Sequence, residues 1–333
     1  MSISAKKFDY KGKEAVKLTC GKYEAIVAPF VGSNVIRFRD TEAGIEVFRY
    51  DESLTPEELV KSAEVYGLPT LYLPNRLAGG VLRVSDATYS LPINDVLGNH
   101  IHGFLHKREH KIEEVSSTEA GASVKTSYTY DENDEFFKFF PVSFKAEFTI
   151  SLEKSGLNYS FTMTNTSDRQ LPYGVCNHTT ICAPFLKDGK PLDVHLYLPV
   201  GDKWELSRSC IPTGGFLPQT NHDRQYLTGS LIPVKQDIDN DVFFAEVGSL
   251  DGNPFRGAVV TDGPSGKKIV YEVCDDFKYW IVWNDHGEKG FFCPEPSTWL
   301  IDAPNQPLPV DESGYRELAP GESNTLTERF YTA

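Results

Sequence analysis

The densest cluster of polar side chains that could transfer protons or bind ligands is one histidine-rich segment. Asn99 to His110 (NHIHGFLHKREH) holds four of the eight histidines: His100, His102, His106 and His110. An HxH spacing puts two imidazoles on one face of a strand, as in metal sites of β-sandwich enzymes. Gly103 argues against one continuous helix that presents His106 and His110 together. Two interpretations stay open: a metal site, or histidines that are exposed or hydrogen-bonded on a loop and a strand, with His102 the candidate for function.

Two further segments hold a candidate acid and a candidate base. His178 lies in the apolar and β-branched run from Leu171 to Phe185 (LPYGVCNHTTICAPF). Such surroundings shift the pKa of an imidazole, which suits general acid catalysis and equally suits a buried, hydrogen-bonded histidine. Glu295 stands between Pro294 and Pro296, which predicts a rigid loop around its carboxylate. Apolar neighbours make that carboxylate a stronger base near neutral pH.

The fourth segment, Leu73 to Gly80 (LPNRLAGG), joins Asn75 and Arg76 to two glycines. Its hydrogen-bond donors lie beside a backbone that can approach a ligand closely. The alternative is an ordinary turn with an exposed arginine.

The elements that must position these residues are predicted to be almost entirely β-strands. β-Branched and aromatic residues alternate with polar ones between turn-forming clusters. One helix is predicted, because Thr55-Pro56-Glu57-Glu58 supplies a capping residue, a proline at the first helical position and a capping-box glutamate. The expected strands are Asn34–Phe38, Glu46–Tyr50, Ser123–Tyr130, Ser143–Ile150, Leu157–Thr164, Val194–Leu198, Ala258–Thr261, Lys268–Val273 and Tyr279–Trp283.

Composition limits the class of protein. The 333 residues include 33 Lys and Arg against 47 Asp and Glu, a net charge of −14 that argues against nucleic-acid or anionic-membrane partners. Without a linker or low-complexity tract, residues 1–333 are predicted to form one domain, a large antiparallel β-sandwich. Met1–Tyr10 lacks the apolar stretch of a signal peptide, and the six cysteines lack paired spacing, which favours free thiols in the cytoplasm.

Taken in order, these segments resemble the aldose 1-epimerase (galactose mutarotase) family. The matching motifs lie between about residues 75 and 305. They are Asn75-Arg76 with Ala78-Gly79-Gly80, Ile101-His102-Gly103, Pro172 to Pro184 with His178, Pro212-Thr213-Gly214, and Glu295-Pro296 with Asp302-Ala303-Pro304-Asn305.

The resemblance implies a galactose mutarotase-like supersandwich with a sugar cleft on one sheet and no metal or organic cofactor. By this resemblance Glu295 is the base, His178 is the acid, and His102 and Arg76 hold or polarise the ring oxygen and its neighbouring hydroxyls. It also implies a sugar-binding aspartate, for which we favour Asp241 by its spacing to Phe243, with Asp239 close behind. Candidates for stacking on a sugar face, or for the core, are Trp280, Trp283, Trp299 and Phe104.

The leading hypothesis is therefore an aldose 1-epimerase that acts on a free sugar, as a cytoplasmic monomer or homodimer. One alternative is a relative that acts on a sugar phosphate or only binds carbohydrate, with Arg83, Lys107 and Arg108 available to neutralise a phosphate. The other is a metal-dependent β-sandwich enzyme built on His100, His102, His106 and His110.

Overall fold

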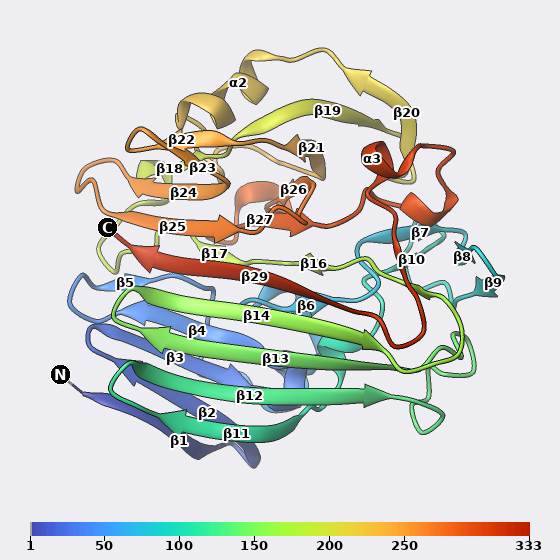
Figure 1. The fold of residues 1–333 in the computed structure, drawn as a ribbon. Coiled ribbons are helices and arrows are strands. Elements are labelled where there is room, and N and C mark those ends of the chain that lie inside the picture. Colours follow the sequence, from blue (N-terminus) through green and yellow to red (C-terminus); the bar gives the residue numbers. More distant parts are fainter. Residues whose placement is uncertain (1) are drawn as a thin grey trace.

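The computed structural model describes residues 2–333, so Met1 lies outside the described residues. Three large antiparallel sheets form most of the molecule (Figure 1). The N-terminal sheet contains β1 (Ile3–Tyr10), β2 (Lys13–Cys20), β3 (Tyr23–Ala28), β4 (Asn34–Asp40) and β5 (Ile45–Glu46), in that order.

The two larger sheets bring together strands from distant parts of the chain. The central sheet contains, in spatial order, β11 (Lys111–Ser117), β12 (Gly121–Tyr130), β13 (Phe144–Glu153), β14 (Gly156–Asn165), β29 (Ser323–Thr332), β25 (Lys268–Val273), β24 (Gly257–Asp262) and β18 (Val194–Tyr197). The second sheet contains β20 (Pro212–Leu217), β19 (Val200–Leu206), β21 (Asp241–Ala245), β26 (Tyr279–Trp283), β27 (Phe291–Ser297), β16 (Cys176–Asn177) and β6 (Thr70–Leu71), with β17 (Ile181–Cys182) also paired to β27.

Short pairs and helices complete the fold. The two-stranded pairs are β7 (Arg76–Ala78) with β10 (Asn99–Ile101), β8 (Val81–Val84) with β9 (Ala87–Ser90), β15 (Leu171–Pro172) with β28 (Glu317–Leu318), and β22 (Gly248–Leu250) with β23 (Asn253–Phe255). The α-helices are α1 (Pro56–Lys61), α2 (Asn221–Thr228) and α3 (Val310–Ser313). The 3₁₀ turns are η1 (Pro29–Val31), η2 (Ala63–Val65), η3 (Leu105–Lys107), η4 (Pro191–Asp193), η5 (Asp285–Gly287) and η6 (Ala303–Asn305).

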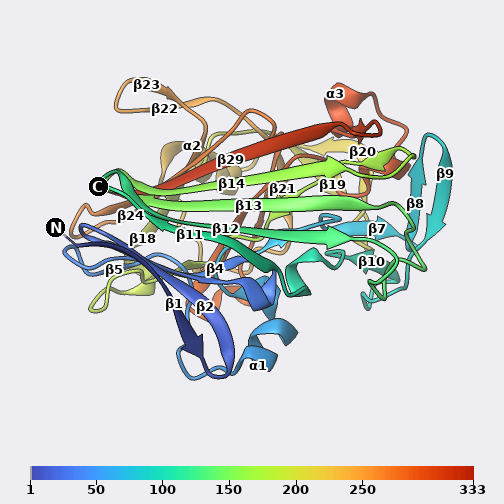
Figure 2. The same ribbon diagram turned by 60° about the horizontal axis from the view of Figure 1, so that its bottom comes forward.

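Alternation along the central strands builds the core. In β13 every second residue from Phe144 to Leu152 is buried, while the residues between them are partly exposed. The N-terminal and second sheets both cover the buried face of the central sheet, as the turned view in Figure 2 shows for the N-terminal strands. Phe48 meets Phe330 edge-on at 5.0 Å between ring centroids, and Trp280 of β26 meets Tyr271 of β25 at 5.9 Å. The predicted antiparallel β-sandwich is confirmed.

The strand predictions agree closely where alternation is strong. The bounds of β25 and β26 are those expected, and β12 and β14 extend the expected ranges by one or two residues. β13 begins one residue later than expected and ends three residues later. The expected strand Glu46–Tyr50 is wrong in extent, because regular pairing stops at Glu46 and only an isolated bridge from Phe48 to Ile181 follows.

The expectation of a single helix is also wrong, although the helix itself is confirmed. At α1 the Thr55 amide donates to Glu58 Oε2 at 2.8 Å and the Glu58 amide donates to Thr55 Oγ1 at 3.3 Å. The missed helix α2 has the same kind of box, formed by Thr220 and Asp223. Its signal was weak because this eight-residue segment is mostly polar and shows no apolar periodicity. Within residues 2–333, no helix is long and apolar enough to cross a membrane.

Candidate active site

A cavity of about 290 Å³ lies beside the second sheet. Five of the six residues that the sequence assigns to the site line it: Asn75, Arg76, His102, His178 and Glu295. The other lining residues are Glu64, Val65, Ile101, Asp239, Asn240 and Trp283. The volume is at the lower end of the range for small-molecule sites.

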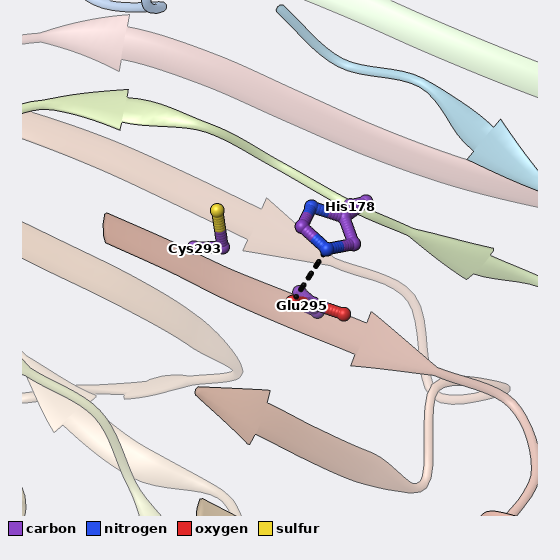
Figure 3. A group of neighbouring side chains, drawn as sticks. All are labelled: His178, Cys293 and Glu295. Atoms are coloured by element: carbon purple, nitrogen blue, oxygen red, sulfur yellow. Dashed lines mark ion pairs between the residues drawn. The ribbon is translucent and has the colours of Figure 1, made fainter. Parts of the chain in front are cut away.

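A carboxyl group and an imidazole meet in the wall of this cavity. His178 Nε2 lies 3.1 Å from Glu295 Oε1, although the two residues are far apart along the chain (Figure 3). Both side chains are nearly enclosed, with Glu295 2% and His178 6% exposed. Cys176 Sγ lies 3.8 Å from the other carboxyl oxygen of Glu295.

Glu295 stands in a strand and not in the rigid loop that the flanking prolines predicted. In the ladder with β26, Pro294 pairs with Val282, Glu295 with Ile281 and Pro296 with Trp280. In an antiparallel strand the backbone N–H groups of alternate residues point toward opposite neighbouring strands. The Glu295 N–H can therefore point toward β26, while the nitrogens of Pro294 and Pro296, which carry no hydrogen, point toward the other side.

The far side of β27 has a gap at these prolines. There β17 pairs with Phe291 and Phe292, and β16 pairs with Ser297, so among the described residues no strand pairs with 293–296 on this side. His178 belongs to the link between β16 and β17. The gap therefore lets an imidazole from this link reach Glu295.

Burial favours the neutral form of both groups. It raises the pKa of Glu295 well above its usual value, and the positive charge of Arg76 offsets only part of this effect. Burial likewise lowers the pKa of His178 to about 4, against a smaller opposite effect of the Glu64 charge. Near neutral pH the pair holds one proton between a donor and an acceptor, which is the state that combined acid and base catalysis requires.

His102 faces His178 across the cavity wall. The ring centroids lie 5.4 Å apart and the rings are nearly perpendicular. Burial lowers the pKa of His102 and the neighbouring His178 lowers it further, so His102 is a neutral imidazole that can donate one hydrogen bond and accept another. Its amide donates to the carbonyl oxygen of Asn75 at 2.8 Å, which ties the ends of β10 and β7 together.

Arg76 is held by two acidic residues that were not predicted to act with it. Its Nε donates to Asp95 Oδ2 at 2.9 Å. Asp302 accepts from the Ala78 amide at 2.9 Å, and its own amide donates to the Arg76 carbonyl at 3.0 Å. The Asp302–Asn305 motif therefore fixes β7, and N–H groups of the guanidinium remain for a ligand.

Asp241 does not line the cavity, and the neighbouring Asp239 does. Asp241 pairs with Val282, which pairs with Pro294. Residues directly opposite in a ladder share a face, so Asp241 points to the other face of the sheet from Glu295. Its carboxylate is held there by Lys203 Nζ at 2.6 Å, His222 Nε2 at 2.9 Å and Tyr226 OH at 3.0 Å. The preference for Asp241 over Asp239 is corrected accordingly.

Glu64 is the cavity carboxylate that the sequence reasoning missed. His106 Nε2 lies 3.0 Å from its Oε1, and Lys107 forms an ion pair with it. Burial alone would raise the pKa of Glu64, but the hydrogen bond from His106 and the nearby positive charges lower it below its ordinary value, so the group is ionised. Its sequence neighbours carry no motif, and its partners lie more than forty positions away.

The histidine-rich segment does not form a metal site. Among the described residues, the groups with metal-ligand spacing are His178 with Cys293 and Glu295, and His222 with Asp223 and Asp241. His100, His106 and His110 are buried, not exposed, and each is bonded elsewhere. Their partners are the Pro92 carbonyl oxygen at 2.8 Å, Glu64 at 3.0 Å and Ser33 Oγ at 2.8 Å, respectively.

Of the four aromatic candidates for stacking, Trp283 lines the cavity and packs 5.8 Å from the His178 ring. Trp280, Trp299 and Phe104 belong to the core. The basic residues considered for a phosphate do not line the cavity. Arg83 donates to Asn305, Lys107 pairs with Glu64, and Arg108 forms two hydrogen bonds with Asp134.

Comparison with known proteins gives matches over nearly the whole chain. A family model described as aldose 1-epimerase matches residues 14–331. A galactose mutarotase-like protein from Clostridium acetobutylicum superposes with a TM-score of 0.96 at 28% identity, covering 99% of this chain and 98% of that one. Galactose 1-epimerase from Lactobacillus acidophilus superposes with a TM-score of 0.72 at 16% identity, covering 100% and 99%.

A curated relative matches over a shorter region. The LacX protein of Lactococcus lactis is 25% identical over 201 residues, which are 60% of this chain and 63% of LacX. The match therefore spans less than two thirds of that relative's length.

Proposed function

Because the chain belongs to the aldose 1-epimerase family, we propose that it is an isomerase that interconverts the α and β anomers of a free aldose. The observation that carries this proposal is the 3.1 Å contact between His178 Nε2 and Glu295 Oε1 in the cavity wall. The two oxygens that exchange protons in mutarotation are bonded to the same anomeric carbon, so an acid and a base must stand close together.

In the proposed mechanism the sugar inserts its anomeric centre against this pair. The proton that the pair shares first moves from Glu295 to His178, across the 3.1 Å contact. The Glu295 carboxylate then accepts the proton of the anomeric hydroxyl while the His178 imidazolium donates a proton to the ring oxygen. The bond between the anomeric carbon and the ring oxygen breaks, which gives the open-chain aldehyde and leaves the enzyme with one proton moved from His178 to Glu295. Rotation about the neighbouring carbon–carbon bond and reversal of both transfers close the other anomer and restore the enzyme.

The remaining cavity residues position the sugar in this proposal. Arg76 and His102 supply donors for the ring oxygen and the adjacent hydroxyls, and Asp239 accepts hydrogen bonds from hydroxyls further from the reacting carbon. The ionised Glu64 and the carboxylate of Asp239 make a phosphorylated sugar the less favourable substrate, because both carboxylates would repel a phosphate.

The test is polarimetry on freshly dissolved α-glucose and α-galactose with Glu295→Gln and His178→Ala. We expect each substitution to lower the catalysed rate at least about 10²-fold, because each removes one proton-transfer group. Glu147→Gln and His195→Ala, on strands away from the cavity, are matched controls that keep the wild-type rate.

Two outcomes contradict the proposal. Unchanged rates in both site variants overturn the acid and base assignment. A wild-type protein that accelerates mutarotation of neither these hexoses nor a panel of pentoses overturns the proposed reaction.

A further inference from the structure

We propose that His178, Cys293 and Glu295 form a zinc-binding site, and that a zinc ion bound there shuts the active site. The binding itself rests on the geometry of these side chains. The inhibition additionally rests on the function proposed above.

The three side chains gather on one side of β27 (Figure 3). Cys293 and Glu295 are two positions apart on β27, so the pleat puts both on the face where His178 lies. One ligand atom from each residue lies within 4.8 Å of the other two, and the His178 and Glu295 atoms are already 3.1 Å apart. Two of the ligands stand on a strand in the middle of a sheet, which limits their movement.

The donor set is one that zinc prefers. Thiolate, imidazole and carboxylate are its three protein ligand types, and zinc sites with three protein ligands keep a fourth position open. Cys293 is fully buried and does not line the cavity, whereas His178 and Glu295 do, so an ion enters from the cavity side and directs its open position there.

Binding balances in charge and protons. The Cys293 thiol loses its proton, the proton held by the His178 and Glu295 pair is also released, and the resulting thiolate and carboxylate neutralise the two positive charges of zinc. The ion occupies the lone pairs that would otherwise accept the substrate proton. Zinc therefore competes with the sugar, and a chelator reverses the inhibition.

The other group with metal-ligand spacing, His222 with Asp223 and Asp241, does not need a metal ion to balance its negative charge. Around Asp241 and Asp223, the Lys203 ammonium already lies 2.6 Å and 3.2 Å from the two carboxylates. A lysine thus supplies the positive charge there. No lysine or arginine nitrogen forms an ion pair with Glu295 among the described residues.

The experiment compares wild type with Cys293→Ser and Cys176→Ser after metal removal. Cys176 is a matched control, because its thiol is equally buried and touches the other oxygen of Glu295 but is outside the ligand group. Binding is measured by zinc titration calorimetry and by the thiolate-to-cobalt absorption of the Co²⁺-loaded protein. Inhibition is measured by polarimetry at increasing zinc concentration.

We expect one zinc per chain and a thiolate-to-cobalt band in wild type and Cys176→Ser. In Cys293→Ser the band disappears, and half-inhibition requires at least about tenfold more zinc, while the metal-free rate stays at the wild-type level. Cys293→Ala gives the same result if serine perturbs folding. A cobalt band that survives in Cys293→Ser, or a wild type that binds no zinc, overturns the site.

The cobalt and calorimetry readouts separate this inference from the proposed reaction. A protein without epimerase activity that binds one zinc through Cys293 leaves the site standing and removes only its inhibitory role. A protein with epimerase activity that zinc fails to inhibit, although zinc binds through Cys293, overturns the claim that the ion shuts the active site.

Discussion

Asp239 and Asp241 are two positions apart, yet only the first lines the cavity. The alternation of side chains would place both on one face of a regular strand, but β21 begins at Asp241 and Asn240 has a left-handed backbone with φ of +58°. The chain therefore changes direction between the two aspartates. As a result, one carboxylate faces the cavity and the other is enclosed by Lys203, His222 and Tyr226.

Substitution of the two aspartates should affect different properties: sugar binding for Asp239 and stability for Asp241. We expect Asp239→Asn to raise KM about tenfold with a smaller change in kcat, because it weakens ground-state hydrogen bonds to the sugar. We expect Asp241→Asn to lower the free energy of unfolding by about 2 kcal/mol, because Lys203 and His222 lose a charged partner. Steady-state kinetics and chemical denaturation of both variants measure the contrast. A larger KM effect in Asp241→Asn would contradict the placement.

At the scale of single residues, the sequence predicts those residues of the site that belong to a short motif. Asn75, Arg76, His102, His178 and Glu295 each stand in a short motif, and the structure brings all five to one cavity. Glu64 has no motif, since its position depends on His106 and Lys107 folding back against η2. The choice between Asp239 and Asp241 required the register of β21 against β26, which a spacing cannot give.

At the scale of elements, the turn after β10 fixes the orientation of His102. His102 and Gly103 both have left-handed backbones, with φ of +65° and +57°. A Cβ added to Gly103 would lie 2.0 Å from the Tyr72 carbonyl oxygen, so the two backbones meet without room for a side chain. This close approach holds the His102 ring against His178.

Gly103→Ala should therefore damage both stability and activity. We expect a loss on the order of 3 kcal/mol in the free energy of unfolding, from backbone strain and the clash together, and a fall in kcat because His102 moves. Gly98→Ala is the matched control: its φ is +83°, but beyond its two chain neighbours no atom lies within 4 Å of an added Cβ, so only the strain of about 1–2 kcal/mol applies. Equal effects of the two substitutions would show that the contact with Tyr72 is unimportant.

The strands show which elements a sequence can specify. Where one face is buried and the other is partly exposed, as in β13 and β14, alternation gives the strand directly. In β27 all seven residues are buried and two are prolines, so neither alternation nor composition indicates a strand. It forms because β26 pairs with it along one side, and because on the other side no strand among the described residues pairs with the prolines, which could not donate a hydrogen bond.

At the scale of the whole molecule, a buried polar network joins the central sheet to the second sheet. Asn177 Nδ2 of β16 donates to Glu328 Oε1 of β29 at 2.5 Å, and Asn177 Oδ1 accepts from Thr70 Oγ1 at 2.6 Å. Thr70 Oγ1 also lies 2.5 Å from the hydroxyl of Tyr159 in β14. The network anchors the residue that precedes His178.

Glu328 makes the stability of the protein depend on pH. Burial raises its pKa to about 8, against the smaller opposite effect of hydrogen bonds from Asn177 and Tyr271. When the pKa of a carboxyl group is higher in the folded than in the unfolded chain, then at any pH between these two pKa values the group is protonated only in the folded chain. The unfolded chain therefore binds fewer protons, and the contribution of Glu328 to stability falls as pH rises from about 4.5 to 8.

Glu328→Gln should remove this dependence, because the amide is neutral at every pH and still accepts from Asn177. We expect the free energy of unfolding of the variant, relative to wild type, to rise with pH and to gain roughly 4 kcal/mol by pH 8. Urea denaturation at pH 5, 6, 7 and 8 measures the difference. Parallel pH curves for the two proteins would mean that Glu328 is not protonated in the folded state.

β29 lies between β14 and β25 in the middle of the central sheet, although it follows every other strand of that sheet along the chain. While a ribosome is still making the protein, β14 and β25 each expose an unpaired edge, and both edges can recruit strands of other nascent chains. Only when residues 323–332 have left the exit tunnel can the two halves close. We therefore expect the risk of aggregation, and the benefit of a chaperone, to be greatest before residues 323–332 leave the tunnel.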